Sequence, residues 1–143
     1  MSNVSVGARW CSWAPYFLSM LRIIAAFLFV QYGSAKLLAF PATIMPGGGT
    51  VQVTSLPGFA GTLELVGGAL LLLGLFTRPV AFVLSGEMAA AYFMAHARGG
   101  FWPVLNGGVP AVIFCFVWLY ISAAGPGPWS IDALLRGSVG QSE

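Results

Sequence analysis

Long apolar runs, separated by short polar or glycine-rich stretches, dominate this chain of 143 residues. A helix that crosses a membrane needs roughly 20 apolar residues, or fewer where its neighbours thin or tilt the span. The pattern therefore predicts an all-α integral membrane protein, a four-helix antiparallel bundle that forms a single domain over residues 1–143. The predicted spans lie at about residues 15–38, 59–76, 80–97 and 109–124.

Residues that stop helices separate these spans. Residues 39–58 hold three prolines and four glycines, and Gly125-Pro126-Gly127-Pro128 ends the fourth span. Beyond it, Ser130 is expected to cap a short helix over residues 131–135, with Asp132 in the first turn, where the helix dipole favours an acid. We expect this C-terminal helix to lie at the membrane interface.

The composition supports a membrane location. Only 7% of the residues are charged and 58% are hydrophobic, whereas a soluble domain has about 25% charged residues. Most of the surface must therefore face the lipid bilayer, other membrane subunits or a second copy of the chain. The net charge of +2, without a basic patch, argues against nucleic acid as a partner.

The distribution of basic residues predicts the orientation. Four spans bring both termini to one side, which carries Arg9, Arg78 and Arg136, while Lys36 and Arg98 lie on the other. Cytoplasmic loops carry an excess of lysine and arginine. The chain is therefore predicted to be a multi-pass protein with both termini in the cytoplasm.

Two opposite charges lie at the same depth within the predicted spans. Arg22 is roughly 10 Å and Glu87 roughly 12 Å inward from the cytoplasmic end, at 1.5 Å per residue. An isolated charge in hydrocarbon costs several kcal/mol, so the two are predicted to form a buried ion pair. Such a pair can fix the register of the helices or serve as a proton or ligand site.

A second polar layer is predicted near the outer boundary. Lys36, Glu64 and His96 fall within about two turns of that boundary, with Tyr32 and Asn106 close by. These five residues are the ligand-binding candidates, and a purely structural role for the layer stays open. Glu87 and His96 are nine residues apart, which is half a turn out of phase on an ideal helix, so they are expected to face different neighbours.

The inventory of metal-binding and redox residues is small. The chain has one histidine, and its two cysteines do not form a C-x-x-C motif. One histidine cannot supply a bis-histidine haem, and we expect no metal site and no intrinsic cofactor. Any electron carrier would belong to a partner.

Several short motifs, spread over about residues 17–135, carry a family resemblance. Together they resemble the DoxX family of small bacterial membrane proteins. The family often has histidine where this chain has Tyr32, and glutamate where it has Val109. The motifs are Leu21-Arg22, Gly33-x-x-Lys36, Glu64-x-x-Gly67-Gly68, Gly74-Leu75-Phe76-Thr77-Arg78, Glu87-Met88, Ala91-Tyr92-Phe93 with His96, Asn106-Gly107-Gly108, and Gly125-x-Gly127-x-x-Ser130-x-Asp132.

The resemblance implies a four-helix bundle in the bacterial cytoplasmic (inner) membrane. It also implies a redox role, since family members are linked to thiosulfate:quinone oxidoreductase, to terminal quinol oxidase and to enzymes of thiol and superoxide defence. We therefore expect a membrane subunit or partner of a redox complex, with a quinone or sulfur compound as candidate ligand on the outer side.

We expect a non-catalytic subunit; if the chain is catalytic, the resemblance implies a component of a quinone-linked oxidoreductase. Two other classes stay open. One is a small transporter or ligand-binding membrane protein, and the other is a structural or assembly subunit without a small-molecule site.

Overall fold

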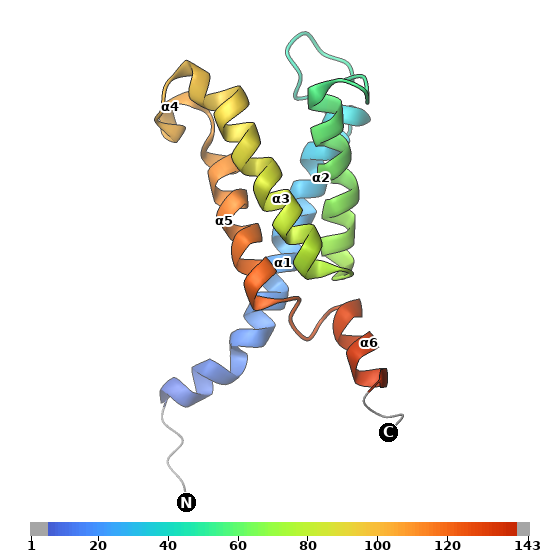
Figure 1. The fold of residues 1–143 in the computed structure, drawn as a ribbon, viewed down its shortest axis with the longest axis vertical. Helices are drawn as coiled ribbons and strands as arrows, with labels where there is room; N and C mark the ends of the chain where they lie inside the picture. The colour runs from blue at the N-terminus through green and yellow to red at the C-terminus, as the bar shows by residue number, and fades with distance from the viewer. Residues whose placement is uncertain (1–5, 140–143) are drawn as a thin grey trace, which may run out of the picture.

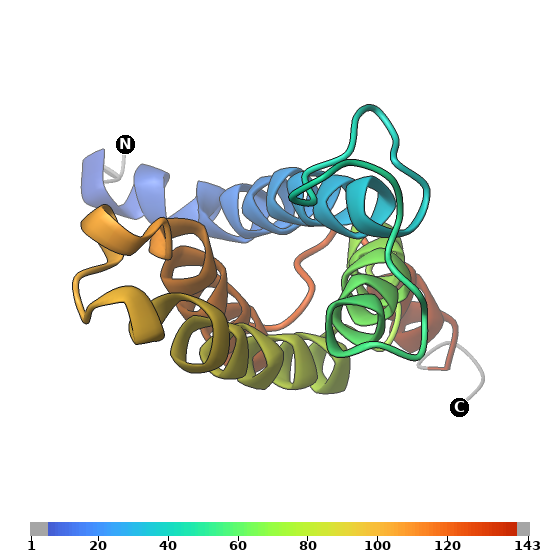
Figure 2. The ribbon, with the colours of Figure 1, turned by 90° about the horizontal axis from the view of Figure 1, so that it is seen from above.

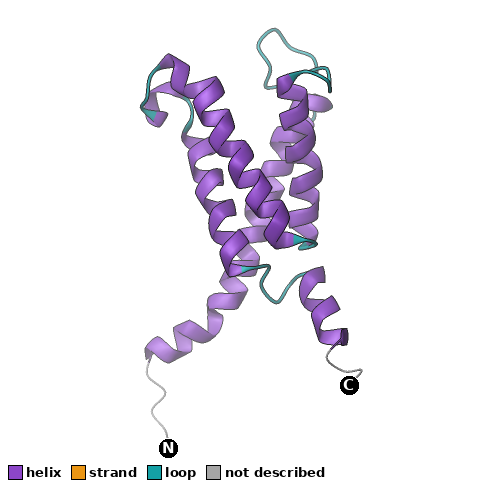
Figure 3. Ribbon diagram, viewed as in Figure 1, coloured by secondary structure: helices purple, strands orange, loops and turns teal. Residues whose placement is uncertain are grey.

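The computed structural model describes residues 6–139, and in these all regular structure is helical (Figure 3). Two short irregular turns, η1 and η2, continue α3, and a four-residue helix precedes α5. The elements are α1 (Val6–Leu37), α2 (Leu56–Leu73), α3 (Thr77–Ala91), the π-helical turn η1 (Tyr92–His96), the 3-10 turn η2 (Ala97–Gly99), α4 (Pro103–Asn106), α5 (Val109–Ala124) and α6 (Ile131–Val139).

Three stretches are long and apolar enough to cross a membrane. They are Trp10–Leu37, Leu56–Leu73 and Thr77–Gly99, and the apolar α5 is shorter, with 16 residues. The prediction of an all-helical membrane protein is thus confirmed for the described residues. The apolar run at 109–124 has the predicted bounds, whereas α1 begins earlier than residue 15.

The helices pack as two pairs (Figure 1). α1 lies against α2 and α3 against α5, and further contacts join α2 to α3 and α1 to α5. Seen from above, the four helices surround a common centre (Figure 2). We call the end with the α2–α3 turn and α6 the α6 end, and the opposite one, with the 38–55 loop and α4, the α4 end.

α1 continues through Pro15, and a side chain one turn later bonds to the proline. The Ser19 hydroxyl donates to the carbonyl oxygen of Pro15 at 3.2 Å. Aromatic side chains also hold the first turns, since the ring centroids of Tyr16 and Trp129 lie 5.7 Å apart. The helix begins at Val6, so its first turns lie before the predicted start of the span at residue 15.

α2 has clear signals at both ends. The Ser55 hydroxyl accepts a hydrogen bond from the Gly58 N–H at 3.2 Å, so the helix begins three residues earlier than predicted. Gly74 ends it in the left-handed conformation, with φ of 69°. The turn into α3 follows immediately.

An aromatic cluster joins the two helix pairs. Phe29 of α1 meets Phe114 and Trp118 of α5, with ring centroids 5.1 and 5.4 Å away. Phe29 and Trp118 are almost fully buried. The packing of these rings fixes α1 against α5, where the two helices share few other contacts.

Close packing of α1 on α2 depends on Gly33. A Cβ atom on Gly33 would lie 2.5 Å from the backbone nitrogen of Leu65 and 2.7 Å from the carbonyl oxygen of Gly61. Only glycine fits here, so the two backbones come into direct contact, as small residues allow in membrane helices. This contact sets the distance between the charged residues described next.

Candidate functional site

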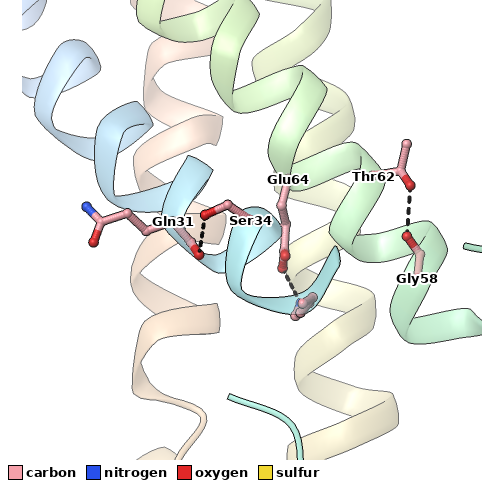
Figure 4. A network of polar contacts seen from close by, with 6 residues as sticks. Gln31, Ser34, Gly58, Thr62 and Glu64 are labelled. Carbon is pink, nitrogen blue, oxygen red and sulfur yellow. Dashed lines mark hydrogen bonds and ion pairs between the residues drawn. The ribbon is translucent and has the colours of Figure 1, made fainter. Parts of the chain in front are cut away.

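Lys36 and Glu64 form an ion pair between α1 and α2. Lys36 Nζ lies 2.6 Å from Glu64 Oε1, and Glu64 is almost fully buried. Figure 4 shows the Glu64 side chain leaving α2 toward the end of α1, with this contact dashed. The structure thus brings together two of the five ligand-binding candidates.

Glu87 of α3 lies within the range of electrostatic interaction with this ion pair. Both of its carboxylate oxygens are buried, and neither they nor Glu64 Oε2 has a hydrogen-bond partner among the described residues. The charged groups within electrostatic reach of Glu87 are Glu64 and Lys36. We call these three residues the Lys36–Glu64–Glu87 cluster.

The two acids of the cluster lie well inside their helices, whereas Lys36 reaches Glu64 from the last turn of α1. Glu64 is nine residues from the end of α2 and Glu87 is ten residues from the start of α3, about 14 and 15 Å along the helices from the α6 end. The sequence placed Glu64 in an outer layer and Glu87 in an inner one. That division is wrong, because α2 and α3 run from the same turn and carry the two acids at nearly equal depth.

His96 and Asn106 form a separate polar contact at the α4 end. His96 Nδ1 lies 3.1 Å from the backbone carbonyl oxygen of Asn106. The Asn106 side chain donates its Nδ2–H to the Gly100 carbonyl oxygen at 2.6 Å, and its Oδ1 accepts from the Gly108 N–H at 2.8 Å. These bonds fold the chain between η1 and α5. His96 and Glu87 face different neighbours, as expected from their spacing.

Tyr32 lies apart from these polar groups. Its ring meets Phe114 with centroids 6.1 Å apart, and 37% of the residue is exposed. The five ligand-binding candidates therefore do not converge on one site. They divide into the Lys36–Glu64 ion pair, the His96–Asn106 contact and an aromatic contact of Tyr32.

The predicted Arg22–Glu87 ion pair is wrong. The fully buried guanidinium of Arg22 donates instead to backbone carbonyl oxygens. Its Nε bonds to Pro126 at 2.9 Å and its Nη1 to Leu72 at 2.9 Å, and further bonds reach the carbonyls of Leu71 and Trp129.

Helix ends explain this choice of partners. Leu71 and Leu72 lie in the last turn of α2, where carbonyls lack partners within the helix and carry the negative end of the helix dipole. The segment that follows α5 brings the carbonyls of Pro126 and Trp129 to the same guanidinium. Glu87 interacts with the Lys36–Glu64 pair and not with Arg22. Arg22 therefore has a structural role at the α6 end, where it joins α1 to the end of α2 and to the segment after α5.

Asp132 connects α6 to the same region. It lies in the first turn of α6, as predicted, and its carboxylate accepts hydrogen bonds from the N–H groups of Phe76 and Thr77 at 2.9 and 2.8 Å. Asp132 therefore caps the start of α3. The Ser130 hydroxyl accepts from the Ala133 N–H at 3.1 Å, so the predicted cap of α6 is confirmed.

An apolar pocket of about 390 Å³ opens on the other side of α3, between η1, the segment before α4, and α5. None of the five ligand-binding candidates lines it. Sequence analysis missed it because its aromatic residues come from three separate segments of an apolar chain. Its lining includes Met88, Tyr92, Phe93, Phe101, Trp102 and Cys115.

Comparison with known proteins identifies the family. The sequence pattern of the DoxX family matches residues 17–97, more than half of the chain. The chain belongs to the DoxX family. This region of the DoxX protein contains most of α1 and all of α2 and α3, and with them the whole Lys36–Glu64–Glu87 cluster.

Two bacterial relatives also resemble this DoxX protein. An uncharacterised protein of Haemophilus influenzae is 46% identical over 121 residues, which cover 82% of this chain and 90% of the relative. An uncharacterised membrane protein of Mycobacterium tuberculosis is 27% identical over 129 residues, covering 80% and 78% of the two chains. No solved structure matches the chain.

Proposed function

We propose that this DoxX protein is a membrane subunit of a redox complex in which a partner carries the electrons, and that it exchanges a proton at the Lys36–Glu64–Glu87 cluster. The observation that carries the proposal is the buried, unpaired carboxylate of Glu87 beside the Lys36–Glu64 ion pair. With all three groups ionised, the cluster has one net negative charge in an apolar region. Binding one proton neutralises it and lowers the cost of burial.

In a redox complex, the proton bound at this cluster can take part in quinone reduction. Reduction of a quinone consumes protons as well as electrons, so a proton-binding carboxylate within the membrane suits a subunit next to a quinone site. The resemblance to DoxX proteins of quinone-linked complexes points the same way. The electrons would come from a partner subunit, since the sequence has no C-x-x-C motif and only one histidine.

We also propose that α1, α2, α3 with its turns, and α5 all cross the inner membrane, with the α6 end in the cytoplasm. α5 is about 24 Å long, less than a typical hydrocarbon core of about 30 Å, so it depends on its neighbours to span. The α6 end carries Arg9, Arg78 and Arg136, whereas the other end carries Lys36 and Arg98. The positive-inside rule then favours a cytoplasmic α6 end. Fusion of reporter enzymes to the 38–55 loop and after α6 tests this orientation.

The decisive experiment combines purification and kinetics. The tagged protein is isolated from its native membranes in mild detergent, and a quinone-linked oxidoreductase is expected to co-purify. In that complex, Glu87→Gln should slow quinone turnover by at least about 100-fold, the scale of lost proton transfer. Ser85→Ala, two residues away on α3, is the matched control and should retain normal turnover.

Three results point to other functions. A complex that assembles and turns over normally with Glu87→Gln contradicts the proton role and favours a structural or assembly subunit. Purification without any redox partner contradicts the redox assignment. If the protein alone then supports proton-dependent uptake in proteoliposomes, and Glu87→Gln abolishes it, the chain is a small transporter.

The apolar pocket beside α3 supports a second role, the binding of a quinone ring. Its volume of about 390 Å³ lies within the range of small-ligand sites, which are mostly apolar and aromatic. Phe93 of η1 and Trp102, directly before α4, both line the pocket and supply flat aromatic surfaces. Such a site would hold the quinone on the face of α3 opposite the cluster.

Filling the pocket tests this role. Val112 lines the pocket, whereas its neighbour Ile113 is exposed on the outside of α5. Val112→Phe should weaken binding of a short-chain quinone analogue at least about tenfold, and Ile113→Phe should not. Equal binding by the two variants would exclude this pocket as the quinone site.

A further inference from the structure

A second hollow, of about 610 Å³, lies at the α6 end. It is open to the surface and is lined by the early part of α1, the start of α3, the end of α5, residues 126–128, and α6. Leu18 and Pro126 give it an apolar wall, and two arginines, Arg78 and Arg136, contribute to the lining. The Lys36–Glu64–Glu87 cluster contributes nothing to it.

The arginines are held in place without being neutralised. Arg78 donates to the last carbonyls of α5, Ser122 at 3.0 Å and Ala124 at 3.5 Å, while remaining exposed. Arg136 is also exposed and donates its Nε–H to the carbonyl oxygen of Asp132 at 3.2 Å. These partners are neutral carbonyl groups, so both cations remain available to an anion.

The nearby acid offsets only part of this charge, because the Asp132 carboxylate interacts with the cation of Arg136 but not with that of Arg78. The Asp132 carboxylate accepts hydrogen bonds from the Phe76 and Thr77 N–H groups, which hold it at the start of α3. Asp132 is absent from the lining of the hollow, whereas both arginines form part of it.

Aromatic residues place the hollow at the level of lipid headgroups. Trp13, Tyr16 and Trp129 cluster at the same end, with ring centroids 6.0 and 5.7 Å apart. Tryptophan and tyrosine concentrate at membrane–water boundaries. Basic pockets between membrane helices at this level bind anionic lipid headgroups.

We propose that this hollow binds an anionic phospholipid, with its phosphate between Arg78 and Arg136. The glycerol and the first acyl carbons would lie on the apolar wall at Leu18 and Pro126. This wall favours a lipid over free phosphate, which has no apolar part. The inference requires only that the chain lies in a membrane and is independent of the proton role.

Native mass spectrometry of the protein in mild detergent tests the proposal. Phosphatidylglycerol is expected to form a one-to-one complex that survives removal of the detergent, and phosphatidylethanolamine, with no net charge, to bind more weakly. Arg136→Gln should reduce phosphatidylglycerol affinity about fivefold, equivalent to about 1 kcal/mol for one surface cation. Arg136→Lys, which retains the charge, should recover most of it.

Arg98→Gln is the matched control, because it removes the same charge from the opposite end of the molecule and should leave lipid binding unchanged. Thermal unfolding of each variant separates lost binding from lost fold. Equal phosphatidylglycerol affinity of Arg136→Gln and Arg98→Gln would overturn the proposal. So would binding of inorganic phosphate that competes fully with the lipid. The Glu87→Gln variant should still bind the lipid. The lipid site and the proton role are therefore tested independently of each other.

Discussion

Arg22 donates its Nε–H to the carbonyl oxygen of Pro126 at 2.9 Å, across 104 residues of sequence. The same guanidinium bonds to the last turn of α2 and to Trp129. One buried side chain therefore ties α1, the end of α2 and the segment before α6 to each other. The charge that was predicted to pair with Glu87 therefore has a structural role, through backbone carbonyls and not through an acid.

Replacement of Arg22 should destabilise the α6 end. Arg22→Met retains much of the side-chain volume but leaves buried carbonyls without a donor, at about 1–3 kcal/mol for each. We expect the free energy of unfolding to fall by at least about 2 kcal/mol, measured by denaturant unfolding in detergent micelles. Arg98→Met, at an exposed position, should change it little; equal effects of the two substitutions would contradict the role of Arg22.

Lys36 and Glu64 should be energetically coupled. Lys36→Met leaves the buried Glu64 carboxylate without its cation and should lower the free energy of unfolding by about 3 kcal/mol. Adding Glu64→Leu should restore most of this loss, because the two side chains can then pack as apolar groups. A double-mutant cycle measures the coupling, and additive effects of the two substitutions would show that the ion pair contributes nothing.

The proximity of Lys36 and Glu64 was predictable, although Glu64 lies nearer the middle of its helix than the predicted outer layer implied. Both lie within a few turns of the same helix ends, and a long cationic side chain can cover the remaining distance. The bounds of α5 were also predictable, because Gly108 and Gly125 enclose an uninterrupted apolar run. These features depend on local sequence and on helix geometry.

The partners of Arg22 and the path of α3 were not predictable in this way. Backbone carbonyls are present at every residue, so the sequence gives no sign that those of Pro126 and Trp129 meet Arg22. The π-helical turn at Tyr92–His96 changes the phase of the helix, also without a distinctive residue pattern. Depth along ideal helices also paired Glu87 with Arg22, whereas its charged neighbours are Glu64 and Lys36, which depends on how α2 and α3 pack.

Gly33 should tolerate no side chain. In Gly33→Ala, the new methyl group would meet the backbone of Leu65 and Gly61, so α1 and α2 must separate. Overpacking of this kind costs about 1–3 kcal/mol.

Gly86→Ala is the matched control, since nothing lies within 4 Å of an added Cβ there. It should be neutral or stabilising by up to about 1 kcal/mol. The measurement is thermal unfolding in detergent, and similar unfolding temperatures for the two variants would show that α1 and α2 can move apart freely.

Asp132 should make stability depend on pH in the acid range. Burial raises the pKa of Asp132, but hydrogen bonds from the Thr77 and Phe76 N–H groups and the charge of Arg136 outweigh it, so the pKa lies below its ordinary value of 3.8. The folded state therefore favours the ionised carboxylate. Its contribution to stability is complete above the unfolded-state pKa and is lost as pH falls through the lower folded-state pKa.

Asp132→Asn isolates this contribution. The amide retains the shape but not the charge at the start of α3, so the variant should be less stable than the parent by about 1 kcal/mol near neutral pH. The difference should shrink as the pH falls from 3.8 through the lower folded-state pKa, because protonation of the parent carboxylate removes the charge that the fold stabilises. Unfolding temperatures of both proteins in acid-stable detergent, measured from neutral to acidic pH, provide the test. A difference that stays constant over that range would mean that the Asp132 cap acts through shape and not through charge.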